Sequence, residues 1–418
     1  MSGLRPSAAV IAVAAALLLA APGSALARDC PPTVRAWNAI VLEVSTGEVA
    51  CERAADQRRP VGSTVKLMTA LLTLERAQLS DRFQATSYRP APYESQIGLI
   101  PGERMSVRDL LRGLLAESGN DAAMALAEGV AGSERAFVRL MNRRARELGL
   151  RNTRYRNPIG LDQRGAYSSA RDLVTLATLL RTKPFFRRTV NKERVQLATG
   201  DHPRTFDNRN QLLGEAEWIN GVKTGHTGNA GWVLVGSGRS NGIQVVSAVL
   251  GTPSERARDA DTLALLTFGR RAFQRITAAP EGRSVDVSVP IRYRRGAELG
   301  LVIGPNGQRT VVPDGERDRV VVKPTRWPTE VEGPIAAGTV LGEADVLQDG
   351  RKIATIPLVA GWDVAKADLA QRTKSWFTRP LAVVLAFAVL GGTVLLARRR
   401  RRPRGPRPRR AREEARTA

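Results

Sequence analysis

Two residues in the first third of the chain have the types and spacing of a nucleophile and its base. Ser63 and Lys66 are three positions apart, and on a helix this spacing places both side chains on one face. A serine hydroxyl becomes nucleophilic when a neighbouring base takes its proton, and a desolvated lysine amine can be that base. Taken alone, the pair also fits an ordinary helix start with a solvated lysine.

Two further short motifs add groups of the same kind. Ser118-Gly119-Asn120 supplies a second hydroxyl and an amide, and Lys223-Thr224-Gly225 supplies a second amine. The chain contains only eight lysines, so a Lys-Thr-Gly match by chance is rare. The three motifs occur in the order used by penicillin-binding proteins and β-lactamases, and together they indicate a serine active site.

The elements expected around these motifs place each one suitably. Leucines and Met68 recur at helical spacing between 67 and 74, which predicts a buried helix with Ser63 in its first turn and Gly62 just outside it. Helices are also expected over 107–115 and 124–130, with the Ser118 motif on the loop between them. Lys223 falls on a predicted strand over 218–224.

The wider pattern predicts an α/β unit followed by a small β domain. A hairpin over 36–52 opens the first unit, further strands are expected over 231–236 and 243–250, and helices over 172–181 and 263–273. Helices flanked by strands from both ends of one segment imply a single α/β unit. We assign residues 28–276 to it, 282–364 to an all-β domain, and 365–379 to a linker.

The C-terminus predicts a membrane anchor. Residues 381–397 are apolar and uncharged, and five consecutive arginines follow at 398–402. We expect a transmembrane helix over 380–397 with a cytoplasmic arginine-rich tail over 398–418; a buried core helix is the alternative. Eleven arginines of that tail contribute to the net charge of +24, so the charge does not indicate a nucleic-acid partner.

The N-terminus predicts export. Arg5 precedes an apolar stretch over 8–21, and Ala25-Leu26-Ala27 fits a signal-peptidase site, which defines a signal peptide over 1–27. We therefore expect a single-pass protein of the cell membrane with an extracytoplasmic catalytic domain. Cys30 and Cys51 could pair there, although two buried thiols fit the sequence equally well.

Longer segments around the motifs resemble one family. Residues 101–111, 118–123, 157–162 and 223–232 are similar to the D-alanyl-D-alanine carboxypeptidases among low-molecular-mass penicillin-binding proteins, of the peptidase S11 family. The resemblance covers residues 35–275 strongly and the β domain weakly, through Pro357-Leu358-Val359. It implies an α/β (α+β) catalytic domain of the penicillin-binding-protein and β-lactamase type, with an antiparallel sheet and helices.

The resemblance also implies the catalytic roles. Ser63 would be acylated, Lys66 would be its general base, and Ser118 would relay the proton. Backbone N–H groups of Ser63 and His226 would form the oxyanion hole. The substrates implied are peptidoglycan stem peptides, with β-lactam antibiotics as acylating analogues, and no cofactor is implied.

The remaining implied roles concern substrate binding. Asn120 would hold the substrate amide, and Lys223, on the strand with Thr224 and Gly225, would supply positive potential that helps keep Lys66 deprotonated. Thr224 would bind the terminal carboxylate together with Arg258. A salt bridge between Arg258 and Asp259 or Glu255 is the alternative for that arginine.

Several rival functions are weaker. A β-lactamase needs a deacylating carboxylate between Asn120 and Lys223, and no convincing glutamate-plus-asparagine loop occurs there. A D,D-endopeptidase acting on cross-links and an inactive wall-binding scaffold remain as alternatives. Two histidines, His202 and His226, and two cysteines indicate no metal site. The chain departs from the family by carrying Ala166 where histidine is frequent.

Overall fold

The computed structural model describes residues 29–305, 307–377 and 380–400. The predicted signal peptide and nearly all of the arginine tail lie outside this range. The chain divides into two compact units. The first contains the described residues up to Arg275 together with Val311–Arg317, and the second contains Ile276–Thr310 and the residues from Asp318 onward.

An antiparallel five-stranded sheet forms the centre of the first unit, in the order β2-β1-β9-β8-β7. Its strands are β1 (Asn38–Glu43), β2 (Val49–Arg53), β7 (Ile219–Thr227), β8 (Gly231–Ser240) and β9 (Ile243–Thr252). The first strand therefore pairs with the last, and β7 lies at an edge. The predicted hairpin and the three later strands correspond to these elements.

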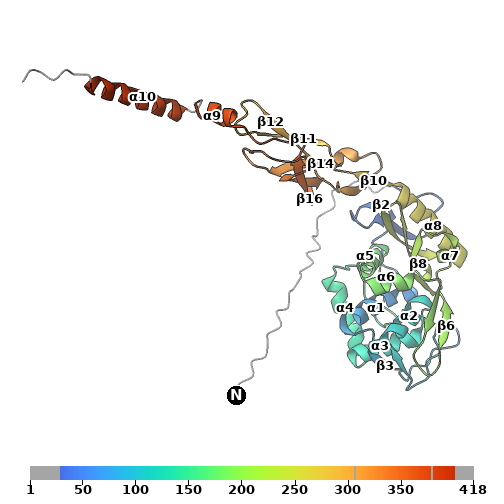
Figure 1. The fold of residues 1–418 in the computed structure, drawn as a ribbon. Coiled ribbons are helices and arrows are strands. Elements are labelled where there is room, and N and C mark those ends of the chain that lie inside the picture. The colour runs from blue at the N-terminus through green and yellow to red at the C-terminus, as the bar shows by residue number, and fades with distance from the viewer. Residues whose placement is uncertain (1–28, 306, 378–379, 401–418) are drawn as a thin grey trace, which may run out of the picture. The chain divides into compact units, whose positions relative to one another are not determined.

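The sheet has an apolar core on each face because side chains alternate along its strands. On β8, Val233 and Val235 belong to one buried cluster, and Leu234 between them belongs to the other. Helix α8 (Glu255–Arg271) covers the face of Leu234, where Leu265 and Leu266 join the same cluster. Figure 1 shows α8 beside β8.

The helices of the opposite face carry the larger cluster. They are α1 (Lys66–Arg76), α2 (Val107–Ala116), α3 (Asn120–Ala131), α4 (Glu134–Glu147), α5 (Ala170–Arg181) and α6 (Pro184–Val190). Serine side chains cap α2, α4, α5 and α8 by accepting a hydrogen bond from the backbone N–H three residues later. Short elements complete the unit: η1 (Gly62–Val65), β3 (Arg82–Gln84), β4 (Arg104–Ser106), β5 (Arg194–Leu197), β6 (Arg204–Asp207) and α7 (Leu212–Glu215).

Three element boundaries differ from the prediction. The third predicted helix begins earlier, at Asn120, because its motif residue already has helical geometry. The helix predicted over 263–273 begins at Glu255, where Ser254 supplies the cap, and Phe273 lies on a strand. Ser63 lies on the 3-10 turn η1, which leads into α1, so Lys66 is the first α-helical residue.

The second unit contains an antiparallel sheet in the order β11-β12-β16-β15-β14. Val289, Leu301, Val346 and Leu358 belong to its own buried cluster. The strands are β11 (Ser284–Pro290), β12 (Glu298–Ile303), β14 (Val320–Arg326), β15 (Val340–Gln348) and β16 (Arg351–Ala360), with the short turn η2 (Arg317–Arg319) before β14. β10 (Phe273–Thr277) pairs with β13 (Arg309–Pro313), and most of both strands belongs to the first unit.

Two helices follow the second sheet, α9 (Leu369–Phe377) and α10 (Pro380–Arg400). The predicted membrane helix over 380–397 falls on α10, whose side chains are described for residues 384–397. Large apolar side chains there are exposed, among them Leu385, Phe387, Leu390 and Leu395. Within the described residues, no helix meets both the length and the apolarity that a membrane crossing requires.

The two cysteines form a disulfide. Cys30 is bonded to Cys51 on β2, across a sequence separation of 21 residues. Both residues are buried in the cluster that lies under α8. The bond therefore fixes the start of the described chain to the first hairpin, and it decides between the two alternatives that the sequence left open.

Candidate active site

Ser63 and Lys66 are in direct contact. Lys66 Nζ lies 2.8 Å from Ser63 Oγ and donates a hydrogen bond of 2.6 Å to the carbonyl oxygen of Ile159. The 3-10 turn η1 continues into α1, so the i, i+3 spacing places both side chains on one side of the turn. A hydroxyl and an amine at this distance can exchange a proton without rearrangement.

Burial prepares Lys66 for that exchange. Its side chain is fully buried, and this desolvation, reinforced by the positive charge of Lys223, lowers its pKa well below the usual value for lysine. Glu94 and Asp121 act in the opposite direction and raise the pKa. The net lowering favours the neutral amine, which is the form that can accept a proton.

Glycines let two other segments approach the nucleophile closely. A Cβ on Gly225 of β7 would lie 2.7 Å from the carbonyl oxygen of Val61 and 3.2 Å from the Ser63 nitrogen. Gly160 has a φ of +91°, and a Cβ there would lie 2.2 Å from the carbonyl oxygen of Gly62. Both distances are too short for a side chain, so each position requires glycine. The third residue of the Lys-Thr-Gly motif thus brings β7 against the turn of Ser63.

Ser118 has an unusual backbone conformation for a residue other than glycine. Its φ is +69°, in the left-handed region. The side chain is buried, and Oγ has no hydrogen-bond partner among the described residues. A buried hydroxyl without a partner in a strained backbone is typical of a functional site.

Asn120 is held by an acidic residue that the sequence motifs did not indicate. Asn120 Nδ2 donates a hydrogen bond of 2.5 Å to Glu94 Oε2, and the Tyr88 hydroxyl donates to the same carboxylate. Burial alone would raise the pKa of Glu94, but these hydrogen bonds outweigh it and lower the pKa. Glu94 therefore carries a negative charge that acts on Lys66, and its hydrogen bond with Asn120 Nδ2 orients the amide of Asn120.

Lys223 is buried among further charges. Its Nζ donates to the carbonyl oxygen of Thr224 at 3.1 Å. Burial, and then the positive charges of Arg209 and Arg258, lower its pKa to about 7. Arg209 forms an ion pair with Glu117, the residue before Ser118. Neither Arg209 nor Glu117 was among the predicted site residues, because only the fold brings them near Lys223.

Arg258 lies in the same region and is almost fully buried. Its guanidinium donates two hydrogen bonds to Asp259, at 2.8 and 2.9 Å, and forms an ion pair with Glu255 at 3.0 Å. The structure thus contains the salt bridge that was the alternative for this arginine. It also places Arg258 close enough to Lys223 to lower the pKa of that lysine. Arg256 is exposed.

His226 presents its backbone and its ring in different directions. A Cβ on Gly62 would lie 2.8 Å from the His226 nitrogen, so this backbone group lies beside the turn of Ser63. The imidazole ring packs against Trp232 with the ring centroids 4.1 Å apart. The side chain of His226 therefore has a packing role, whereas its N–H is near the nucleophile. His202, the other histidine, is exposed.

The described side chains contain no group of three or more histidine, cysteine or acidic residues suited to hold a metal ion. The groups that do converge come from η1, α1, the start of α3 and strand β7. They combine a serine, a buried amine whose pKa is lowered, and backbone N–H groups at one point. Such a combination is the chemistry of a class, the serine enzymes that transfer an acyl group through the hydroxyl with lysine as base.

Comparison with known proteins identifies the family. The sequence model described as D-alanyl-D-alanine carboxypeptidase, Peptidase_S11, matches residues 26–254, and the model of the penicillin-binding protein 5 C-terminal domain matches residues 273–366. The first match covers more than half of the chain. The protein therefore belongs to the peptidase S11 family of D-alanyl-D-alanine carboxypeptidases, as the resemblance of its motifs predicted.

Individual relatives agree with this assignment. The chain is 31% identical to the D-alanyl-D-alanine carboxypeptidase DacF of Bacillus subtilis, over 79% of this chain and 86% of the relative. It is 34% identical to the D-alanyl-D-alanine carboxypeptidase of Streptomyces sp. K15, over 64% and 98%. The solved structure of penicillin-binding protein 5 from Haemophilus influenzae superposes with a TM-score of 0.58 at 28% identity, covering 81% and 100%.

Proposed function

We propose that the protein removes the terminal D-alanine from peptidoglycan stem peptides through an acyl-enzyme at Ser63. The observation that carries this function is the 2.8 Å contact between Ser63 Oγ and a fully buried Lys66 whose pKa is lowered. Family membership supports the same reaction and favours a carboxypeptidase over an endopeptidase or an inactive scaffold.

The groups around Ser63 suggest the order of events. Lys66 takes the hydroxyl proton as Ser63 Oγ attacks the carbonyl carbon between the two D-alanines. The backbone N–H groups of Ser63 and His226 stabilise the oxyanion. The C–N bond then breaks, and the departing amine receives a proton that reaches it by way of Ser118. A water molecule then attacks the carbonyl carbon of the ester while Lys66 again acts as the base. The bond to Ser63 Oγ breaks, the hydroxyl regains its proton, and the shortened peptide is released.

Strand β7 supplies the support for the peptide. It is an edge strand of the five-stranded sheet, so one side of its backbone is not paired within that sheet and can bind an extended peptide. Lys223 precedes Thr224 on this strand, and the positive charge of Arg258 acts on Lys223. We assign the terminal carboxylate to Thr224 and Arg258, and the substrate amide to Asn120.

Release of D-alanine from a purified pentapeptide stem tests the function directly. The wild-type protein should release D-alanine, and Ser63→Ala should not. A fluorescent penicillin should label the wild type and not the variant, since a β-lactam amide resembles the scissile bond. Labelling of Ser63→Ala at the wild-type level would mean that another residue is acylated.

We also propose, from the sequence pattern over 381–402 and not from the length and apolarity of the described helix, that the protein is exported and anchored through this segment, with the arginine tail in the cytoplasm. Support comes from the uncharged apolar run over 381–397, the five arginines after it, and the exposure of apolar side chains between 384 and 397. The Cys30–Cys51 disulfide is consistent with an oxidising compartment.

A further inference from the structure

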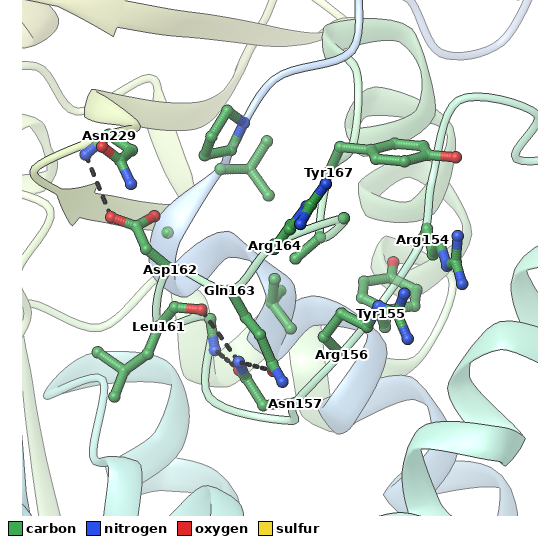
Figure 2. A pocket seen from close by; sticks show the side chains of 17 residues that line it. Arg154, Tyr155, Arg156, Asn157, Leu161, Asp162, Gln163, Arg164, Tyr167 and Asn229 are labelled. Carbon is green, nitrogen blue, oxygen red and sulfur yellow. Dashed lines mark hydrogen bonds between the residues drawn. The ribbon is translucent and has the colours of Figure 1, made fainter.

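A pocket of about 410 Å³ lies beside the turn that carries Ser63, and the catalytic side chains do not form its wall. Val61 and Gly62, which precede Ser63, form part of its wall, and so does Gly160. The side chains of Ser63, Lys66, Ser118 and Lys223 do not line it. Figure 2 shows that most of its polar side chains come from the segment between Arg154 and Tyr167, with Asn229 on another side.

The pocket is lined by three exposed arginines, Arg154, Arg156 and Arg164. None of the three forms an ion pair or a side-chain hydrogen bond with a described residue. A Cβ on Gly165 would lie 3.3 Å from Arg156 Nη2, so this guanidinium rests against the loop backbone. Arg58 does not line the pocket, but its guanidinium lies 4.9 Å from the ring centre of Tyr167, a lining residue.

The one acidic residue in the lining does not neutralise these arginines. Asp162 accepts hydrogen bonds from Thr227 Oγ1 at 2.8 Å and from the Asn229 nitrogen at 3.2 Å. In Figure 2 its carboxylate points toward Asn229. It therefore holds the turn between β7 and β8, while the arginines leave the pocket with an excess of positive charge.

The order of residues along β7 determines which part of a substrate passes the pocket. With the terminal carboxylate at Thr224 and the scissile carbonyl at the His226 nitrogen, the peptide runs antiparallel to β7. Its upstream residues, which stay on the enzyme as the acyl group, then pass Thr227 and Asn229. Asn229 lines the pocket, so an upstream side group within about two or three residues, roughly 10 Å, reaches it.

We propose that this pocket binds a free carboxylate carried by the acyl-donor part of the stem peptide, upstream of the D-alanyl-D-alanine pair. The γ-linked acidic residue of a stem peptide offers such a group. The inference rests on the proposed function and deepens it by assigning a substrate subsite to Arg154, Arg156 and Arg164. The planar guanidinium of arginine can donate two parallel hydrogen bonds to a carboxylate. Its long side chain can also reach a ligand in an open pocket.

Two matched peptides test the proposal. Both end in D-alanyl-D-alanine, and they differ only in whether the upstream γ-linked residue carries a carboxylate or the isosteric carboxamide. The wild type should cleave the carboxylate peptide with a kcat/KM about tenfold higher at low salt, and the preference should shrink as salt screens the charges. Equal kcat/KM values for the two peptides at low salt would overturn the subsite.

Variants locate the preference within the pocket. Arg156→Gln and Arg164→Gln should each lower the carboxylate-to-carboxamide ratio by about threefold, the effect of one exposed charge pair, and the double variant should abolish it. Arg108→Gln, an exposed arginine on α2 outside the pocket, is the matched control and should leave the ratio unchanged. A folding defect would lower both rates together, so the ratio isolates recognition.

The outcomes separate the subsite from the reaction. One outcome is that the wild type releases D-alanine from both peptides while the double variant Arg156→Gln/Arg164→Gln keeps the wild-type carboxylate-to-carboxamide ratio. In that case the subsite is wrong and the carboxypeptidase activity stands. A ratio lowered as much by Arg108→Gln would show a general charge effect and also overturn the subsite. Absence of D-alanine release from either peptide would instead contradict the proposed function.

Discussion

Lys66 is held between opposing charges at the centre of the site. Burial and Lys223 lower its pKa, whereas Glu94 and Asp121 raise it. The amine acts as a base only when it is neutral, so the pH at which activity appears on rising from acid follows this balance. Glu94 is the member of the set that can be changed with least disturbance, because glutamine keeps an acceptor for Asn120.

Glu94→Gln should therefore shift the acid limb of the kcat/KM profile toward lower pH. Removing the negative charge removes an influence that raises the pKa of Lys66, so the neutral amine persists to lower pH. At its optimum the variant should lose about tenfold or less. Glu147→Gln, an exposed carboxylate on α4, should leave the limb in place. A shift toward higher pH would contradict the assignment of Lys66 as base.

Arg258 offers a second test at the residue scale. Arg258→Ala should lower kcat/KM on a D-alanyl-D-alanine peptide by about ten- to a thousand-fold, the loss of one charged contact to the terminal carboxylate. Exposed Arg256→Ala should change it little.

Arg258 also forms an ion pair with Asp259, so the substitution can lower the stability of the fold as well as the activity. The stability of Arg258→Ala must therefore be measured together with its kcat/KM. The unfolding temperature of Arg258→Ala should be lower than that of the wild type, since Asp259 loses its ion-pair partner. With a peptide whose terminal carboxylate is amidated, wild type and variant should react equally. A similar loss on the amidated peptide would make Arg258 a purely structural residue.

At the scale of elements, the site depends on how closely β7 approaches the turn η1. Gly225→Ala should push the strand away, because a Cβ would lie 2.7 Å from the carbonyl oxygen of Val61. The expected loss in kcat/KM is about a hundredfold or more, since the oxyanion-binding N–H groups lose their alignment. Gly228→Ala, where a Cβ meets nothing within 4 Å, should remain near wild type.

Far-ultraviolet circular dichroism of both variants serves as the control for folding. Similar spectra with a loss of activity in Gly225→Ala alone would place the effect at the contact between β7 and η1. Full activity of Gly225→Ala would mean that this contact is not needed for the reaction.

The sequence predicted the elements whose residues carry a local signal. Ser63, Lys66 and Lys223 were found because their motifs are short and their order is specific, and the strands because apolar runs mark them. Helix α4 was not predicted, although Phe137, Met141 and Ala145 recur at helical spacing and are buried, and arginines occupy its other faces as expected for an amphipathic helix. That spacing was a usable signal.

Glu94 and Arg209 left no comparable signal. Glu94 accepts a hydrogen bond from Asn120, which is 26 positions away in the sequence. The charge of Arg209 lowers the pKa of Lys223 because folding brings the two residues near each other. Contacts of this kind depend on how loops pack against the core, and no periodicity or motif length records them. The same holds for the arginine pocket, which three separate segments line.

At the scale of the whole molecule, the proposed anchor is tested by truncation. A chain ending after Trp376 should appear in the soluble fraction after signal-peptide removal, because the apolar residues 381–397 and the arginines beyond them are gone. Its D-alanine release should match that of the full chain in detergent. Retention in the membrane fraction would mean that another segment holds the protein there.

The first unit is completed by Val311–Arg317, which lies beyond Arg275 in the sequence. Val311 is buried in the cluster under α8, and the Asp314 nitrogen donates a hydrogen bond to the carbonyl oxygen of Ala272. The chain therefore leaves the catalytic unit and returns to it before finally departing. A chimera that exchanges the β unit for another domain therefore needs two junctions in the chain and not one. A protein that ended at Arg275 would lack Val311, which is part of the hydrophobic core of the first unit.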